Sequence, residues 1–246
     1  MHLHIGQTRA RPTRCLQSGP LWWRAERIGA ISGFLTIAGL LGNLFFTRNA
    51  PESDQPIAKI ASELAAHENA YLATAAFDAV QVFFFLVFAA ALASLARRAD
   101  EEGGWLWIAI VGGAAVAATL AFASALSLVA AVFSTHYADA GPGAVLASYE
   151  LHTWFLVGTC VPGAVFLAST GAASLRFRIL PRWLAWIAAA DAVAAFVGFG
   201  YIFGNELDGG PLGAVWALAG VALALWIVAV GIALLRGAHA GRPAAA

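Results

Sequence analysis

The sequence predicts an all-α integral membrane protein, a bundle of six transmembrane helices with both termini on the cytoplasmic side. Of its 246 residues, 61% are hydrophobic and only 11% are charged, and the mean hydropathy is +0.76. A soluble domain carries about a quarter charged residues, so this chain cannot cover a surface that faces water. Long apolar runs and an uneven distribution of arginine are the two further observations that predict this fold.

Six apolar runs are long enough to cross a bilayer, which takes about 20 residues as a helix. They are about twice the length of a barrel strand and lack its alternation, so a lipid-facing backbone must satisfy its own hydrogen bonds as a helix. The expected spans are residues 28–47, 71–96, 105–133, 151–175, 183–204 and 212–235. The transmembrane domain is therefore expected at 28–236, between a basic segment at 1–27 and a tail at 237–246.

The first span follows basic residues, as a secretory signal peptide would. Its apolar run at 28–47 is longer than the hydrophobic region of a signal peptide, and the 27 residues ahead of it are too many. We therefore expect an anchor helix that stays in the protein.

Between the first and second spans, residues from about 55 to 69 have the pattern of an amphipathic helix on the outer surface. Asp54 can cap its start, and Ile57, Ile60 and Leu64 fall on one face. This helix either bends at Asn69 or runs straight into the second span, and both interpretations stay open.

The fourth span contains Pro162, whose missing N–H frees the carbonyl of Gly158. We expect a kink at this point. Such a kink can line a cavity, but it is also common in membrane helices, and the sequence favours neither.

The distribution of Arg and Lys predicts the orientation, because short translocated loops avoid positive charge. Only Arg48 and Lys59 fall on one side of the bundle. The other side contains both termini and two inner turns. Its basic residues are Arg9, Arg11, Arg14, Arg24, Arg27, Arg97, Arg98, Arg176, Arg178, Arg182, Arg236 and Arg242. Both termini are therefore expected in the cytoplasm.

Polar residues recur every three or four positions along the second span and the segment before it, which places them on one helical stripe. They are Glu63, His67, Tyr71, Thr74, Asp78 and Gln81. Asp78 is seven residues into the span, roughly 10 Å deep at 1.5 Å per residue. An Asp at a span centre costs about 2.5 to 3.5 kcal/mol, so Asp78 must face the bundle interior or a wet cavity.

A second carboxylate, Asp191, lies in the fifth span, roughly 12 Å from its inner end. No Lys or Arg occurs within any expected span, so burial favours the protonated, hydrogen-bonded form of both carboxylates. Proton-linked chemistry would use such groups. Hydrogen bonds that hold neighbouring helices together would explain them equally well.

We expect an outward-opening polar pocket between the second, fourth and fifth spans, because the fourth span also carries polar residues on one face. Its expected lining and protonatable residues are Asp78, Gln81, Asp191, His152, Thr159, Tyr71 and His67.

Several classes of site are not expected. His67, His136, Glu150 and His152 could approach one another, but no H-x-x-x-H or H-E-x-x-H pair exists, so neither a metal site nor any cofactor is predicted. Balanced charge, with 14 basic and 14 acidic residues, gives no reason to expect nucleic acid.

Cysteine and lysine usage removes two further possibilities. Cys15 and Cys160 lie too far apart in the expected topology to form a disulfide, and we interpret Cys160 as an apolar core residue. Lys59, the only lysine, lies between the first and second expected spans rather than inside the bundle, so a retinal Schiff base is excluded.

Small residues recur four apart, as in Gly29 with Gly33, Gly113 with Ala117 and Gly213 with Ala217. Such faces let helices approach closely. They predict contacts between helices. The expected partners are therefore the lipid bilayer and, in a homo-oligomer, a second copy of the chain.

The inner turn RFRILPRWLAW at 176–186, the stretch LHTWFLVG and the segment GPLWWRAERIGAISG carry a resemblance to a known group. They resemble uncharacterised bacterial multi-pass membrane proteins of domain-of-unknown-function type, which share a Leu-Pro-Arg-Trp-Leu turn, here Leu180 to Leu184. The resemblance implies about six spans in a bacterial inner membrane. It implies no known activity and transfers no catalytic residue.

The leading hypothesis is a non-enzymatic membrane protein that binds or transports a small solute or a proton, with Asp78 and Asp191 as protonatable groups. One alternative is a structural or regulatory membrane subunit. The other is an intramembrane hydrolase built from Asp78, His152 and Ser148. The sequence does not identify a ligand.

Overall fold

The structure, a computed structural model, describes residues 21–48, 50–51, 55–99, 104–137, 142–200 and 211–239, and every regular element in these ranges is helical. The helices are α1 (Leu21–Thr47), α2 (Ile57–Ala66), α3 (Glu68–Ala99), α4 (Gly104–His136), α5 (Pro142–Gly158), α6 (Cys160–Phe177), α7 (Arg182–Phe199) and α8 (Pro211–His239). The segments long and apolar enough to cross a membrane are Ala25–Thr47, Glu68–Arg97, Trp107–His136, Gly143–Phe177, Arg182–Phe199 and Pro211–Gly237. The predicted all-α bundle of six spans is confirmed.

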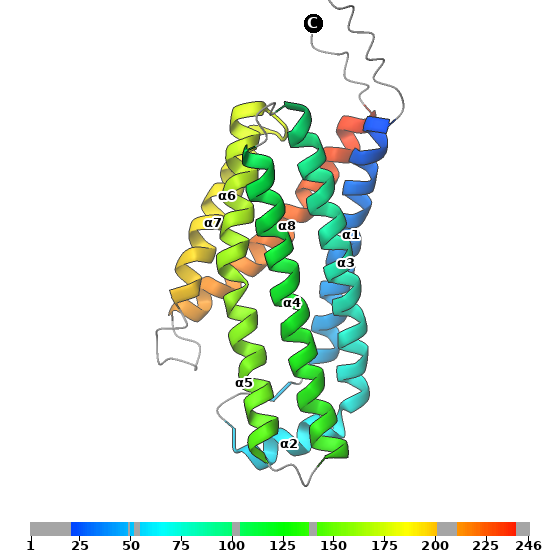
Figure 1. Ribbon diagram of the computed structural model, residues 1–246, viewed down its shortest axis with the longest axis vertical. Coiled ribbons are helices and arrows are strands. Elements are labelled where there is room, and N and C mark those ends of the chain that lie inside the picture. Colours follow the sequence, from blue (N-terminus) through cyan, green and yellow to red (C-terminus); the bar gives the residue numbers. More distant parts are fainter. Residues whose placement is uncertain are drawn as a thin grey trace, which may run out of the picture.

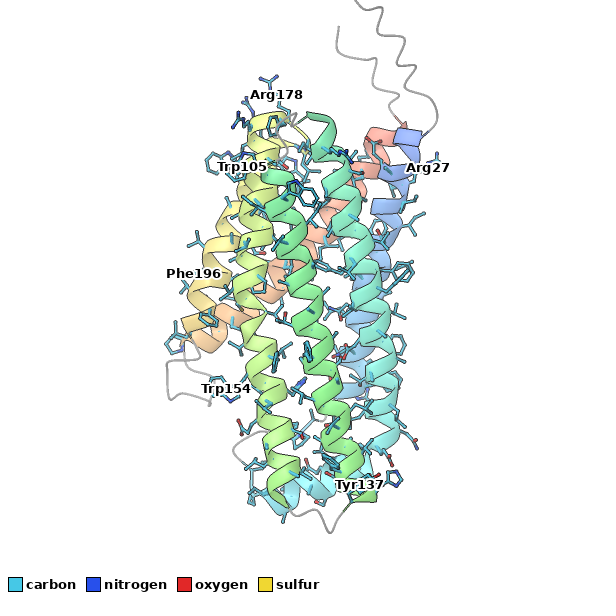
Figure 2. All side chains as sticks on the ribbon, viewed as in Figure 1. Arg27, Trp105, Tyr137, Trp154, Arg178 and Phe196 are labelled. Carbon is cyan, nitrogen blue, oxygen red and sulfur yellow. The ribbon has the colours of Figure 1, made fainter. Side chains whose placement is uncertain are left out.

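The start of α1 and the end of α8 lie at the same end of the bundle (Figure 1). We call this end, which carries Arg27, Arg97, Arg176, Arg178, Arg182 and Arg236, the basic end. Figure 2 shows Arg27 and Arg178 there and Tyr137 at the opposite end. The opposite end is covered by α2, and we call it the α2 end.

The helices pack in two groups joined by α4 and α8. On one side, α1 packs against α3 and α8; on the other, α7 packs against α6 and α8. Helix α4 lies against α3, α5 and α6. Helices α3 and α7 therefore occupy opposite sides of the bundle (Figure 1).

Two of the small-residue faces are used inside the chain. A methyl group added at Gly29 would lie 2.9 Å from Ala91 Cβ on α3, and one at Gly113 would lie 3.0 Å from Ala89 Cβ. Both faces are filled by α3 of the same chain, so they are not available to a second copy. The Gly213–Ala217 face stays a prediction, since Ala217 is exposed.

Most of the buried apolar side chains form one core in the middle of the bundle, around Phe88, Phe166 and Trp226. The rings of Phe166 and Trp226 meet edge to face with centroids 6.3 Å apart. The buried indole satisfies its polar atom by donating a hydrogen bond of 2.9 Å to the Leu184 carbonyl on α7. This core joins α3, α6, α7 and α8.

A second, smaller core lies at the α2 end. Ile60 and Leu64 on α2 are fully buried against Tyr71, Ala130 and Tyr149. We call α2, with the adjoining parts of α3, α4 and α5 that surround these side chains, the α2 lobe.

Helix α2 ends at Ala66, and α3 begins at Glu68. The chain breaks at His67, where the backbone leaves the helical region with φ −119° and ψ 22°. Of the two interpretations left open, the chain bends rather than running straight on, and the bend lies two residues before Asn69. Glu63 and His67 do not continue the stripe of α3, because they belong to α2 and to the turn.

The fourth span is interrupted as predicted. Helix α5 ends at Gly158 and α6 begins at Cys160, so the break falls three residues before Pro162. Proline cannot donate to the carbonyl four residues earlier, and that carbonyl belongs to Gly158. Thr159 N bonds to both Phe155 O, at 3.1 Å, and Leu156 O, at 3.2 Å, which closes the last turn of α5.

The spanning helices differ greatly in length. Helix α7 has 18 residues and is about 27 Å long, whereas α4 has 33 residues and is about 50 Å long. Figure 1 shows that α7 stops well short of the α2 end. The α2 lobe therefore extends beyond the part of the bundle that α7 shares.

Candidate functional site

Asp78 joins three helices. It lies on α3, where its Oδ1 accepts a hydrogen bond from Asn43 Nδ2 on α1 and its Oδ2 accepts one from Ser124 Oγ on α4. Thr47 Oγ1 donates to the Asn43 carbonyl at 2.9 Å and so supports the same contact from α1. Each carboxylate oxygen has a donor, which makes Asp78 a satisfied group.

The other polar residues of the α3 stripe also contact protein. Tyr71 is buried in the α2 lobe, and Thr74 Oγ1 donates to the Ala70 carbonyl at 2.9 Å. A methyl group added at Gly39 would lie 2.9 Å from both Cα and N of Gln81, so the backbone of Gln81 touches α1. His67 is exposed, and its Nδ1 lies 2.9 Å from the Glu63 carbonyl.

His152 and Thr159 tie the fourth span to α4. His152 Nδ1 lies 2.8 Å from the Ala123 carbonyl, and Thr159 Oγ1 lies 3.0 Å from Thr119 Oγ1. Among the hydrogen bonds of the described residues, none joins Ser148 to His152. The serine and the histidine of the hydrolase alternative are therefore not hydrogen-bonded to each other in the described part of the chain, and this alternative stays a hypothesis.

Asp191 has a different environment. It lies in the middle of α7 with 4% of its surface exposed, and neither Oδ1 nor Oδ2 finds a hydrogen-bond partner in the described part of the chain. Helix α7 packs against α6, which carries the half-buried Cys160, and against α8. Asp191 is thus held between α6 and α8 without a polar contact of its own.

The structure does not bring Asp78 and Asp191 into one pocket. They lie on α3 and α7, at opposite sides of the bundle, with α4 and α6 between them (Figure 1). The two carboxylates therefore have separate neighbours, and the pocket expected between the second, fourth and fifth spans stays a prediction.

A cleft does occur at the basic end, between α3, α4, α6 and the turn before α7. It is narrow, with a volume of only about 10 Å³, and its lining includes Leu92, Trp105, Thr170, Ser174 and Leu180. Thr170 is 7% exposed and Ser174 is 1% exposed.

Both hydroxyls of this cleft resemble Asp191 in one respect. The described residues supply no hydrogen-bond partner to Thr170 Oγ1, to Ser174 Oγ or to the two oxygens of Asp191. We call these atoms the orphan groups. A buried polar atom without a partner costs about 1 to 3 kcal/mol, so three such side chains on one helix pair need a reason.

Sequence reasoning did not single out Asn43, Ser124, Thr170 or Ser174. Asn43 gives a signal, because it is the sole amide or charged residue of the apolar run at 28–47. The hydroxyl residues give none, since Ser and Thr in a membrane helix commonly bond to a carbonyl of their own helix.

The described residues contain no group of three or more His, Cys, Asp or Glu side chains placed to hold a metal ion. His136 instead pairs with Glu68, with Nε2 and Oε1 2.9 Å apart at the surface of the α2 lobe.

The fold and these sites define a multi-pass helical membrane protein with one satisfied and one unsatisfied carboxylate inside its bundle. A family model described as Domain of unknown function (DUF4386) matches residues 28–235, and the chain belongs to this family. The match confirms the expected relationship to an uncharacterised family. Neither the curated proteins nor the solved structures contain a significant match.

Proposed function

We propose that the protein lies in the plasma membrane of a bacterium with both termini in the cytoplasm, and that it binds and transfers a proton or a small solute without acting as an enzyme. Asp191 is the group that takes up the proton. The observation that carries the proposal is that this carboxyl, 4% exposed in the middle of α7, belongs to the orphan groups.

The orientation rests on charge and on aromatic residues. Six described arginines lie at the basic end. Three tryptophans near the start of α4 and α7, close to that end, are largely exposed: Trp107 at 65%, Trp183 at 55% and Trp186 at 64%. Exposed tryptophans mark a membrane interface, and arginine marks its cytoplasmic side.

The chemistry follows from the surroundings of Asp191. From Pro211 to Leu235, α8 contains no titratable residue, and α6 contributes only Cys160 and Arg176, the latter exposed near its end. An acid in such a place is neutral when dry and ionises when water reaches it. Alternation between these two forms is what proton binding and release require.

A structural or regulatory subunit is the second candidate. It is favoured by Asp78, His152 and Thr159, each of which makes a polar side-chain contact with a neighbouring helix. A partner would then bind the Gly213–Ala217 face or the α2 lobe, and a second copy of the chain is one such partner.

The experiment compares Asp191→Asn with Asp78→Asn in liposomes that contain a pH-sensitive dye. We expect Asp191→Asn to abolish proton flux driven by an imposed gradient while the protein melts at an unchanged temperature. Asp78→Asn should lower the melting temperature and leave residual flux in the folded fraction. Unchanged flux in folded Asp191→Asn protein would refute the proposal, and a subunit that co-purifies in mild detergent would favour the second candidate.

A further inference from the structure

The turn between α6 and α7 concentrates positive charge at the basic end. Arg176, Arg178 and Arg182 lie within seven residues of the chain, and all three side chains are exposed. Neither ion pair of the described residues involves them, since both pairs lie at the α2 lobe. The described part of the chain therefore supplies no carboxylate to these charges. We call residues 178–182 the arginine turn.

The backbone at Arg178 has an unusual conformation. Its φ of 56° and ψ of 37° lie in the left-handed region, and in the described part of the chain no other residue except glycine has a positive φ. Helices often end in this way at a glycine, whose lack of a side chain removes the steric cost. Here the Arg178 N–H donates to the Ser174 carbonyl at 2.9 Å, and the exposed side chain lies at the end of α6 (Figure 2). Arginine thus occupies a position that glycine would fill at lower cost, and its charge is what glycine would not supply.

The length of α7 sets the depth of Arg182 in the membrane. The helix has 18 residues and is about 27 Å long, slightly less than the hydrocarbon thickness of about 30 Å. A span this short has both ends near the boundary of the hydrocarbon. Arg182 is the first residue of α7, and Trp183 and Trp186 beside it are exposed, as tryptophans at a membrane interface are. The arginine turn therefore lies at the level of the lipid headgroups.

The outer face of α7 continues from the arginine turn as an apolar surface. Helix α7 packs mainly against α6 and α8, which leaves its opposite side uncovered by the described residues. Arg182, Trp186, Ala190 and Val193 recur every three or four residues along this side, so they form one stripe, and all four are exposed. The stripe is about 16 Å long, roughly half the hydrocarbon thickness. It therefore matches one leaflet, with its charge at the headgroup end and apolar side chains below.

The chemistry of the arginine turn suits a phosphodiester. A guanidinium offers two parallel N–H donors that match the oxygens of a phosphate. Arg178 and Arg182 are four residues apart, so their Cα atoms are at most about 14 Å apart, close enough for both long side chains to contact one headgroup. A zwitterionic headgroup also carries a cation, which the arginines repel, whereas an anionic headgroup does not.

We propose that the arginine turn and the outer face of α7 bind one anionic phospholipid of the surrounding bilayer. Its phosphate lies on Arg178 and Arg182, and its acyl chains lie along Trp186, Ala190 and Val193. The site is independent of the proposed function, since it needs neither proton transfer nor a particular side of the membrane.

Native mass spectrometry of the full chain in detergent tests the site, with phosphatidylglycerol as the anionic probe and phosphatidylcholine as the zwitterionic one. We expect the parent to bind phosphatidylglycerol at least about tenfold more tightly, and the double variant Arg178→Gln, Arg182→Gln to lose most of this preference. The matched control is Arg97→Gln, Arg236→Gln, which removes the same charge from exposed positions at the same end of the bundle and should keep the preference. An equal loss in both double variants would show a diffuse attraction to the whole basic end and would overturn the site.

Arg178→Gly separates binding from folding. Glycine adopts the left-handed backbone at lower cost, so the melting temperature in lipid-free detergent should be unchanged or higher. The affinity for phosphatidylglycerol should nevertheless fall several-fold, because one of the two guanidinium groups is gone. A variant that binds this lipid as tightly as the parent would overturn the site.

Soluble glycerol phosphate, which has the headgroup chemistry without acyl chains, tests whether the ligand is a lipid. We expect no displacement of phosphatidylglycerol by an equal concentration of glycerol phosphate, since the apolar stripe of α7 contributes to binding. Full displacement would mean that a free phosphate is the ligand, and the lipid site would be refuted.

Discussion

Asp78 and Asp191 both lie inside the helical bundle, and their neighbours differ. Asp78 receives one hydrogen bond from Asn43 and one from Ser124, and so joins α1, α3 and α4. Asp191, among the orphan groups, lies between α6 and α8 with alanine on either side at positions 190 and 192. The difference shows that an acid in a membrane helix acquires its role from the groups around it rather than from its depth.

The largest effect is expected at Gly39, which lets α1 approach α3 closely enough for Asn43 to reach Asp78. In Gly39→Leu the new side chain would meet the Gln81 backbone, with its Cβ 2.9 Å from Cα. Overpacking commonly costs about 1 to 3 kcal/mol, and here backbone must move, so we expect a loss of about 3 kcal/mol or more in unfolding free energy. Denaturant unfolding in detergent micelles measures it.

Gly220→Leu is the control for this change, because no atom lies within 4 Å of a methyl group added at that exposed position of α8. Its unfolding free energy should stay within about 0.5 kcal/mol of the parent. If both variants lost the same stability, the close approach of α1 and α3 would not be what positions Asn43.

Asp78→Ala comes next. It removes both acceptors and leaves Asn43 and Ser124 without their partner, so the unfolding free energy should fall by about 1 to 3 kcal/mol. The same detergent unfolding assay applies. A variant as stable as the parent would mean that the two hydrogen bonds contribute nothing to the bundle.

Asp191→Leu should act in the opposite direction. Leucine branches at Cγ as aspartate does but has no polar atoms, so the unfolding free energy should rise by about 1 kcal/mol as the cost of an unsatisfied carboxyl is removed. Loss of stability in this variant, measured in parallel with Asp78→Ala, would show that Asp191 has a stabilising partner after all and would end the contrast between the two residues.

The smallest effect is expected at the surface of the α2 lobe. His136 and Glu68 pair at 2.9 Å, but their side chains are 60% and 21% exposed. Exposed ion pairs contribute less than about 1 kcal/mol, so His136→Ala should change the unfolding free energy by no more than this. A change as large as that of Asp78→Ala would indicate that exposure to water is not what separates strong from weak polar contacts here.

The helices could be predicted from the sequence because hydropathy and length are local properties. The kink before Pro162 was predictable for the same reason, since proline acts on its own turn. The position of the break at His67 was not, because it depends on how Ile60 and Leu64 pack into the α2 lobe rather than on a turn signal in the chain.

The candidate site was less predictable. Both aspartates stand out in apolar runs, and the lack of Lys or Arg in the spans is visible in the sequence. The spacing of residues along one helix does not show which helices are its neighbours. The hydrogen-bond partners of Asp78 could therefore not be predicted from the sequence. The isolation of Asp191 depends equally on the arrangement of α6, α7 and α8.

The unequal lengths of α7 and α4 have a practical consequence for imaging. A detergent belt around the 25.6 kDa chain would cover the stretch that α7 occupies and leave the α2 lobe in the open. An antibody fragment raised against that lobe would give small particles a fiducial for alignment, and it would leave the basic end of the bundle uncovered.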